Sequence, residues 1–122
     1  MGKTILIIED EMNLAELLKF RLEVNGYHVE TSYDGHEGVN KIGTMKPDLV
    51  ILDVMLPKMD GYEVIRRIKS DSNTKDIPIV VLTARSQNED LERARNLGAG
   101  SVISKPFDPK KLLSEIEKLL KR

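Results

Sequence analysis

A chain of 122 residues fits one domain and is too short for two ordinary ones, and its 40% of hydrophobic residues is enough to form a core. The 20 acidic and 19 basic residues give a net charge of -1 without a long basic block, which argues against non-specific binding to DNA or RNA. Because the chain has no cysteine, disulfides, thiolate metal sites and cysteine nucleophiles are excluded.

Five short segments have the pattern of β-strands. Four of them are continuous runs rich in Ile, Val and Leu, which is typical of strands buried on both faces of a sheet. The other segment alternates apolar and polar residues, like an edge strand. In chain order, the predicted strands are residues 5–8, 27–31 (the alternating segment), 49–52, 79–82 and 102–103.

Each predicted strand is followed by a segment in which apolar residues recur every three or four positions, the spacing of an amphipathic helix. These segments are residues 14–22, 39–42, 64–68, 91–97 and 112–120. Gly26 and Gly98 are placed like the glycines that end helices, and the Asp-Gly pairs at 34–35 and 60–61 are typical of turns.

The strict alternation of strand and helix predicts an α/β fold, a doubly wound parallel sheet of five strands with five helices on its two faces. We expect residues 1–122 to form a single domain. In a parallel sheet every strand ends at the same edge, which is where such folds bind ligands. The side chains that follow the predicted strands are therefore expected to lie together.

Acidic, hydroxyl and basic side chains follow these strands. Residues 9–11, Glu-Asp-Glu, follow the first strand and Asp53 the third, while Thr83 and Lys105 follow the fourth and fifth. Several carboxylates at one place repel one another unless a cation lies among them. Oxygen ligands without cysteine favour Mg²⁺, or Mn²⁺, over zinc. Because a hydroxyl and an ammonium suit phosphoryl oxygens, the set predicts phosphoryl transfer at a metal site.

Four segments of the chain together resemble the receiver domain of two-component response regulators. They are residues 9–11, 52–61, 81–84 and 105–107, with the sequences EDE, LDVMLPKMDG, VLTA and KPF. They stand in the family's order and spacing over essentially the whole chain. The resemblance implies the flavodoxin-like strand order 2-1-3-4-5, a cis peptide bond before Pro106, and a signalling domain rather than an enzyme.

The same resemblance implies a role for each residue of the predicted site. Asp53 is expected to accept a phosphoryl group from a histidine kinase or a histidine phosphotransfer protein. Thr83 and Lys105 are expected to bind the phosphoryl oxygens. The implied ligands of Mg²⁺ are Asp10, Asp53, the backbone carbonyl of Met55 and, through water, Glu9.

Ordinary structural roles compete with these assignments. Asp10 and Glu11 have the residue types of an N-cap and a first helical turn. Thr83 could be only a β-branched strand residue, and Lys105 could belong to an ordinary loop. An ordinary structural role is least plausible for Asp53, because a lone carboxylate at the end of a buried strand is energetically costly without a partner.

The chain departs from the family at several positions. Val102 stands where receivers commonly carry a tyrosine or phenylalanine switch, so we expect activation through Thr83 and its loop, with Val102 as a packing residue. Met55 and Arg85 are bulky at the positions that tend to set phosphate lifetime, which predicts slow self-dephosphorylation. Residues 98–101 lack the acidic pair common in regulators that dimerise, so we expect a monomer or a weak dimer.

Several other functions compete with this interpretation. A flavodoxin has this fold, but its phosphate loop is incompatible with carboxylates at residues 9–11. A phosphatase of the haloacid dehalogenase type needs a second acid two residues after its nucleophile, where this chain has Met55. A phosphate-independent receiver-like interaction module, and the receiver part of a longer DNA-binding regulator, are also retained.

The remaining expectations concern location and partners. The first residues lack the apolar length of a signal peptide, and no run approaches 18 apolar residues, so we expect a cytoplasmic protein without membrane contact. The expected partners are a sensor histidine kinase or phosphotransfer protein and a downstream protein target, without direct contact to nucleic acid.

Overall fold

Five strands alternate with five helices in the computed structural model, which describes residues 2–84 and 88–121. In chain order the elements are β1 (Thr4–Ile8), α1 (Met12–Val24), β2 (His28–Ser32), α2 (Gly35–Met45), β3 (Leu49–Asp53), α3 (Gly61–Ser70), β4 (Ile79–Thr83), α4 (Asn88–Asn96), β5 (Ser101–Ser104) and α5 (Pro109–Leu120). The predicted strands are confirmed. Their observed ends differ from the predicted ends by no more than one residue.

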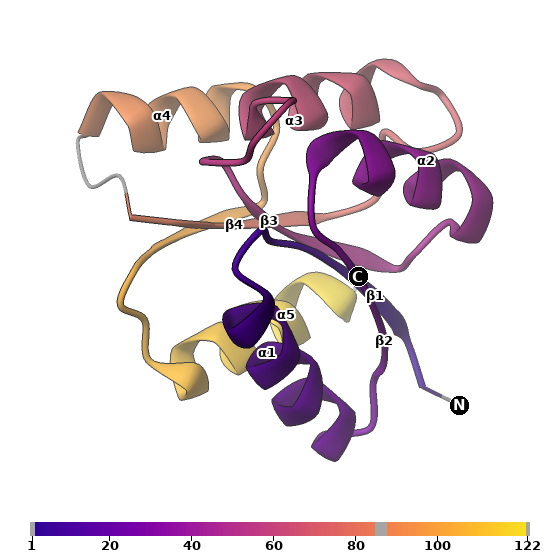
Figure 1. Ribbon diagram of the computed structural model, residues 1–122, viewed down its shortest axis with the longest axis vertical. Helices are drawn as coiled ribbons and strands as arrows, with labels where there is room; N and C mark the ends of the chain where they lie inside the picture. The colour runs from indigo at the N-terminus through magenta and orange to yellow at the C-terminus, as the bar shows by residue number, and fades with distance from the viewer. Residues whose placement is uncertain (1, 85–87, 122) are drawn as a thin grey trace.

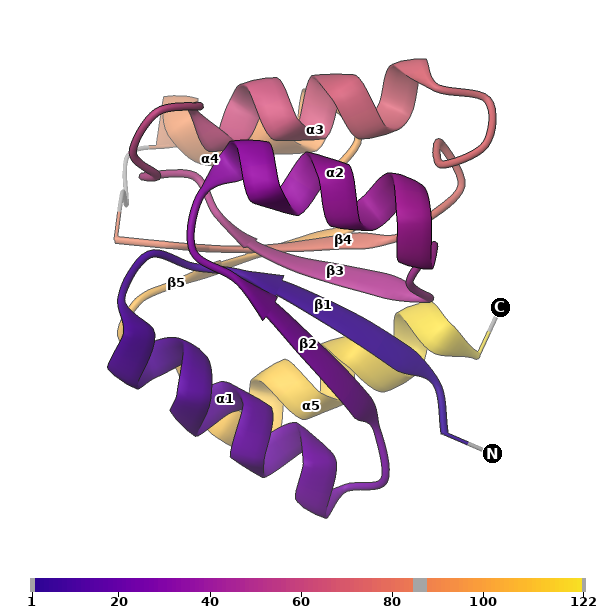
Figure 2. The same ribbon diagram turned by 45° about the vertical axis from the view of Figure 1, so that its right-hand side comes forward.

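The strands form one parallel sheet in the order β2-β1-β3-β4-β5. Helices α1 and α5 cover one face of the sheet, and α2, α3 and α4 cover the other (Figures 1 and 2). The predicted doubly wound, flavodoxin-like fold is therefore confirmed. Because all five strands run in the same direction, their carboxyl ends lie along a single edge.

The core consists of two layers, one on each face of the sheet. Along β1, Ile5 and Ile7 face α1 and α5, whereas Leu6 and Ile8 face α2 and α3, as the alternation of side chains along a strand requires. Every residue of β3 and β4 is buried. This explains why the central strands read as unbroken apolar runs in the sequence.

Aspartates define where three of the helices begin. The side chains of Asp34, Asp60 and Asp108 are N-caps and accept hydrogen bonds of 2.7–2.9 Å from backbone N–H groups in the first turn. The Asp-Gly pairs that the sequence marks as turns are thus the starts of α2 and α3. Gly26 and Gly98 have positive φ angles, 93° and 116°, and confirm the predicted glycines after α1 and α4.

Gly61 lets α3 begin against the chain that follows β3. Its N–H donates to the carbonyl of Val54 at 3.0 Å, and a Cβ at position 61 would lie 2.3 Å from Val54 Cα and 2.8 Å from Asp53 O. These distances are shorter than any side chain tolerates, so only glycine fits here. The contact fixes the start of α3 relative to the carboxyl end of β3.

No helix among residues 2–84 and 88–121 combines the length and apolar character needed to cross a membrane.

We expect Gly61→Ala to lower the free energy of unfolding by about 1–3 kcal/mol, because the added methyl group forces the backbone of α3 away from Val54. The matched control is Gly43→Ala, inside α2, where nothing lies within 4 Å of the added atom. That variant should gain up to about 1 kcal/mol from its lower backbone entropy. Urea unfolding followed by circular dichroism measures both, and equal stabilities would contradict the assignment.

Candidate functional site

The predicted site residues meet at the carboxyl edge of the sheet. Asp53 and Thr83 are the last residues of β3 and β4, Glu9 follows β1, and Lys105 follows β5. Asp53, Thr83 and Glu9 are buried, whereas Asp10 is exposed. The topology therefore brings together residues that are up to 96 positions apart in the sequence.

Lys105 lies among the carboxylates. Its Nζ donates to Asp53 Oδ2 at 2.8 Å and to Glu9 Oε1 at 2.9 Å, and it lies 4.0 Å from Glu11 Oε1. The backbone N–H of Lys105 donates to the carbonyl of Thr83 at 2.8 Å, and the Lys105–Pro106 peptide bond is cis, as the resemblance implies. One ammonium thus offsets the charge of two buried carboxylates.

Asp53 is held from two sides. Its Oδ2 accepts the bond from Lys105, and its Oδ1 accepts a bond of 2.9 Å from the backbone N–H of Met55. Only 6% of Asp53 is exposed. The carboxylate is therefore fixed in orientation by a charged donor and a backbone donor.

Glu9 connects Lys105 to the start of α1. Its Oε2 accepts a bond of 3.1 Å from the N–H of Glu11, and its own N–H donates to the carbonyl of Ser32 at 3.0 Å. The pKa of Glu9 is raised to about 7, chiefly by burial and also by the negative charge of Asp53, whereas the bonds from Lys105 and Glu11 act in the opposite direction. An additional cation at this place would favour the ionised form of Glu9.

Burial disfavours the charged form of Lys105, but its hydrogen bonds to Asp53 and Glu9 outweigh that effect and raise its pKa. The ammonium therefore keeps its proton at every pH at which the fold is ordinarily studied.

Three acids could hold a metal ion. Carboxylate oxygens of Glu9, Asp10 and Asp53 lie within 4.8 Å of one another. Hard oxygen donors and a buried carboxylate with a raised pKa fit Mg²⁺ or Mn²⁺, which bind few protein oxygens and keep several waters. Met55 lies next to this cluster through the bond from its N–H to Asp53.

The structure also decides between some of the alternative roles. Glu11, not Asp10, occupies the N-cap position of α1, and its side chain caps no N–H group. Val102 pairs with Val81 in the sheet and packs, half-buried, against the core layer beneath α3 and α4. Arg85 lies outside the described residues.

Sequence reasoning missed the two backbone donors. The N–H groups of Met55 and Glu11 hold the carboxylates of Asp53 and Glu9, each two residues earlier in the chain. A sequence motif consists of side-chain types and does not show backbone donors. The one available signal is the spacing, because an acid often accepts a bond from the backbone N–H two residues later, as in an Asx-type turn.

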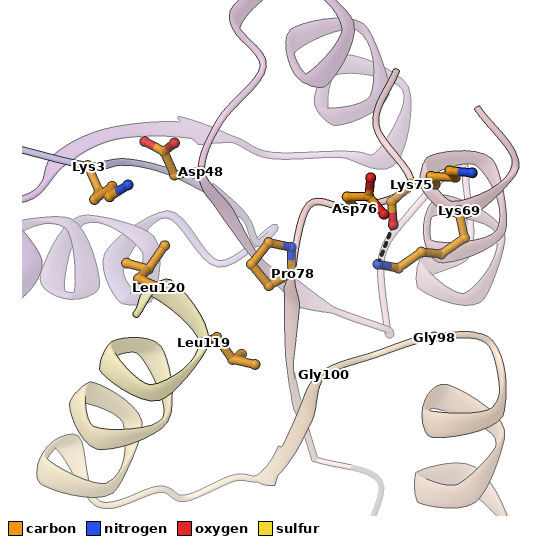
Figure 3. A pocket seen from close by; sticks show the side chains of 10 residues that line it. All are labelled: Lys3, Asp48, Lys69, Lys75, Asp76, Pro78, Gly98, Gly100, Leu119 and Leu120. Carbon is orange, nitrogen blue, oxygen red and sulfur yellow. Dashed lines mark hydrogen bonds between the residues drawn. The ribbon is translucent and has the colours of Figure 1, made fainter. Parts of the chain in front are cut away.

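A hollow lies at the opposite, amino edge of the sheet. The cavity of about 450 Å³ contains none of the predicted site residues. Figure 3 shows Lys69 at its border, where the ammonium donates to the carbonyl of Lys75 at 2.9 Å and also to that of Ile77 at 3.0 Å. Lys69 thus ties the end of α3 to the loop before β4.

Comparison with known proteins gives a consistent result. The family described as response regulator receiver domain matches residues 5–117. The chain is 41% identical over 122 residues to the phosphate regulon transcriptional regulatory protein PhoB of Escherichia coli (strain K12), of which it covers 53%. It is 40% identical to the alkaline phosphatase synthesis transcriptional regulatory protein PhoP of Bacillus subtilis (strain 168), of which it covers 50%. The chain spans about half the length of these curated relatives.

Solved structures show the same similarity in three dimensions. A putative response regulator from Chloroflexus aurantiacus J-10-fl superposes with a TM-score of 0.95 at 34% identity, covering 100% of both chains. The chemotaxis response regulator CheY4 of Vibrio cholerae superposes with a TM-score of 0.92 at 30% identity, covering 98% of this chain and 100% of that one.

We expect Lys105→Met to lower the free energy of unfolding at pH 7 by about 3 kcal/mol, because it leaves the buried carboxylates of Asp53 and Glu9 without their cation. Lys118→Met is the matched control, since that ammonium is exposed and its one ion pair within residues 2–84 and 88–121 is with Glu115 at the surface. The control should change stability by no more than about 0.5 kcal/mol. Urea unfolding compares the two, and similar losses would show that the buried contact does not stabilise the fold.

Proposed function

The chain belongs to the receiver domains of two-component response regulators, and from this premise we propose that Asp53 is its phosphoacceptor. One observation carries the proposal. The Asp53 carboxylate stands at the carboxyl edge of the sheet, fixed by the Lys105 ammonium on one oxygen and by the Met55 N–H on the other. A carboxylate held in this way has the orientation and the charge compensation that a nucleophile for phosphoryl groups needs.

The transfer forms one bond and breaks one. An oxygen of Asp53 bonds to the phosphorus, while the bond from phosphorus to a histidine nitrogen of the donor breaks and its electron pair returns to that nitrogen. Lys105, already beside Asp53 Oδ2, offsets the negative charge of the incoming group. Thr83, at the adjacent strand end, supplies a hydroxyl for the phosphoryl oxygens.

The ligand set proposed for Mg²⁺, with Mn²⁺ as a substitute, is Asp10, Asp53, the carbonyl of Met55 and, through water, Glu9. The proximity of the three acids supports it. When bound, the ion supplies positive charge that reduces repulsion between the acids and the phosphoryl group. Asp10, being exposed, is the acid that can adjust its position most freely.

The domain acts as a signalling module in the cytoplasm rather than as an enzyme with its own substrate turnover. Its donor is a sensor histidine kinase or a histidine phosphotransfer protein, and phosphorylation changes its contacts with a downstream protein. PhoB and PhoP are named as transcriptional regulatory proteins. The similarity to them supports the proposal that this chain is the receiver part of a DNA-binding regulator. We propose that the receiver itself does not contact nucleic acid and is a monomer or weak dimer.

Incubation with acetyl phosphate and Mg²⁺ should add one phosphoryl group, because acetyl phosphate is a small donor that needs no docking surface. Intact-mass spectrometry measures the gain. Asp53→Asn should abolish it, whereas Asp48→Asn, which changes an aspartate at the opposite edge of the sheet, should leave it unchanged. Chelation with excess EDTA should slow the reaction. Phosphorylation of Asp53→Asn at the wild-type rate, or none in the wild type, would refute the assignment.

Met55→Ala should shorten the lifetime of the phosphorylated form several-fold, because we propose that the bulky side chain two residues after Asp53 screens the acyl phosphate from water. Met12→Ala removes another exposed methionine, on α1, and serves as the control. The decay of the phosphorylated mass after removal of acetyl phosphate gives both lifetimes. A wild-type half-life of seconds, or equal lifetimes for Met55→Ala and the wild type, would contradict this screening.

A further inference from the structure

Tyr62 joins α3 to α4 through two different contacts. Its hydroxyl donates to the backbone carbonyl of Asp90 at 3.3 Å, and the Arg93 guanidinium carbon lies 4.1 Å from the centre of its ring. Tyr62 itself is 1% exposed and belongs to the core layer between the sheet and these helices. Figures 1 and 2 show α3 and α4 side by side. One aromatic side chain of α3 therefore contacts both of the first two turns of α4.

Apolar burial alone holds α4 only in part. Among its side chains that the structure describes, Ala94 is buried and Leu91 is half-buried, while Glu89, Glu92, Arg93 and Arg95 are exposed. Leu97, directly after the helix, also packs against the core layer. The contacts with Tyr62 add polar and cation–π anchorage to this modest apolar burial.

The start of α3, which carries Tyr62, also contacts the chain directly after the proposed phosphoacceptor Asp53. Tyr62 is the second residue of α3, and its N–H donates to the cap Asp60 at 2.7 Å. The preceding residue, Gly61, donates to the carbonyl of Val54, the residue after Asp53. The contact between Gly61 and Val54 leaves no space for even one more carbon atom, so the two segments move together.

We propose that Tyr62 is a positioning residue that couples the phosphorylation state of Asp53 to the placement of α4. This inference rests on the proposed phosphorylation of Asp53. An acyl phosphate keeps only one of the two carboxylate oxygens as a carbonyl acceptor, so the bond from Met55 N–H to Asp53 changes. The shift passes through Val54 and Gly61 to Tyr62, and from the Tyr62 ring and hydroxyl to Arg93 and Asp90. The coupling does not require an aromatic residue at position 102.

The test uses Tyr62→Phe and Arg93→Gln in the full chain, with NMR of backbone amides before and after phosphorylation by acetyl phosphate and Mg²⁺. Before phosphorylation, the amides of α4 should exchange with solvent about two- to tenfold faster in Tyr62→Phe than in the wild type, the effect of one lost hydrogen bond. After phosphorylation, the chemical-shift changes within α4 should fall to less than half of their wild-type size in both variants. Shift changes at residues 53–55 and the rate of phosphorylation should be retained.

Two matched controls separate coupling from general loosening. Tyr33→Phe removes a tyrosine hydroxyl that donates to Glu16 on α1, and Arg95→Gln removes an exposed arginine from α4 itself. Both should behave like the wild type in α4, and exchange in α5 should be unchanged in every variant.

The results separate the failure of this inference from the failure of the proposed function. Unchanged exchange in α4 of Tyr62→Phe, or full-size shift changes in α4 of the phosphorylated variants, overturns the coupling while Asp53 remains the phosphoacceptor. A wild type that gains no phosphoryl mass refutes the phosphoacceptor assignment and, with it, the coupling.

Discussion

The ammonium of Lys105, placed between the carboxylates of Glu9 and Asp53, is the interaction on which the arrangement of the site depends. These carboxylates are 2% and 6% exposed, and two buried negative charges so close together would be strongly unfavourable without a cation. The lysine follows β5, and its partners follow β1 and end β3, so one side chain joins three strands of the sheet. The parallel topology makes this contact available, since it delivers all three strand ends to the same edge.

Most of the fold could be predicted from the sequence because its signals are local. Buried parallel strands are short apolar runs, and the residues that follow them must share an edge, so the sequence alone predicts that Glu9, Asp53 and Lys105 lie together. The strand order itself came from resemblance, because neither spacing nor composition determines which strands are neighbours. The Asp-Gly pairs show the limit of local signals, since the same residues that form turns also start α2 and α3.

The parts of the site that could not be predicted are contributed by the backbone. The N–H groups of Met55 and Glu11 donate to Asp53 and Glu9, but the side chains of these two residues are not hydrogen-bond donors. A prediction from residue types therefore misses both bonds. The contacts between Tyr62 and α4 could not be predicted from the sequence for a related reason. An aromatic residue at helical spacing indicates burial, and only the three-dimensional packing shows that its ring meets Arg93 on another helix.

The fixed orientation of Asp53 has a further consequence for the proposed transfer, in what the domain and its phosphodonor each contribute. A nucleophile that already occupies one conformation loses little freedom when the reacting groups align, and its donors need little reorganisation as charge develops. With Asp53 as the proposed nucleophile, the receiver brings a preorganised half of the reaction, since the ammonium and the Met55 N–H are in place beforehand. The donor has to bring chiefly an activated phosphoryl group, so chemically different donors can serve the same site, and selectivity among them must come from surfaces outside it.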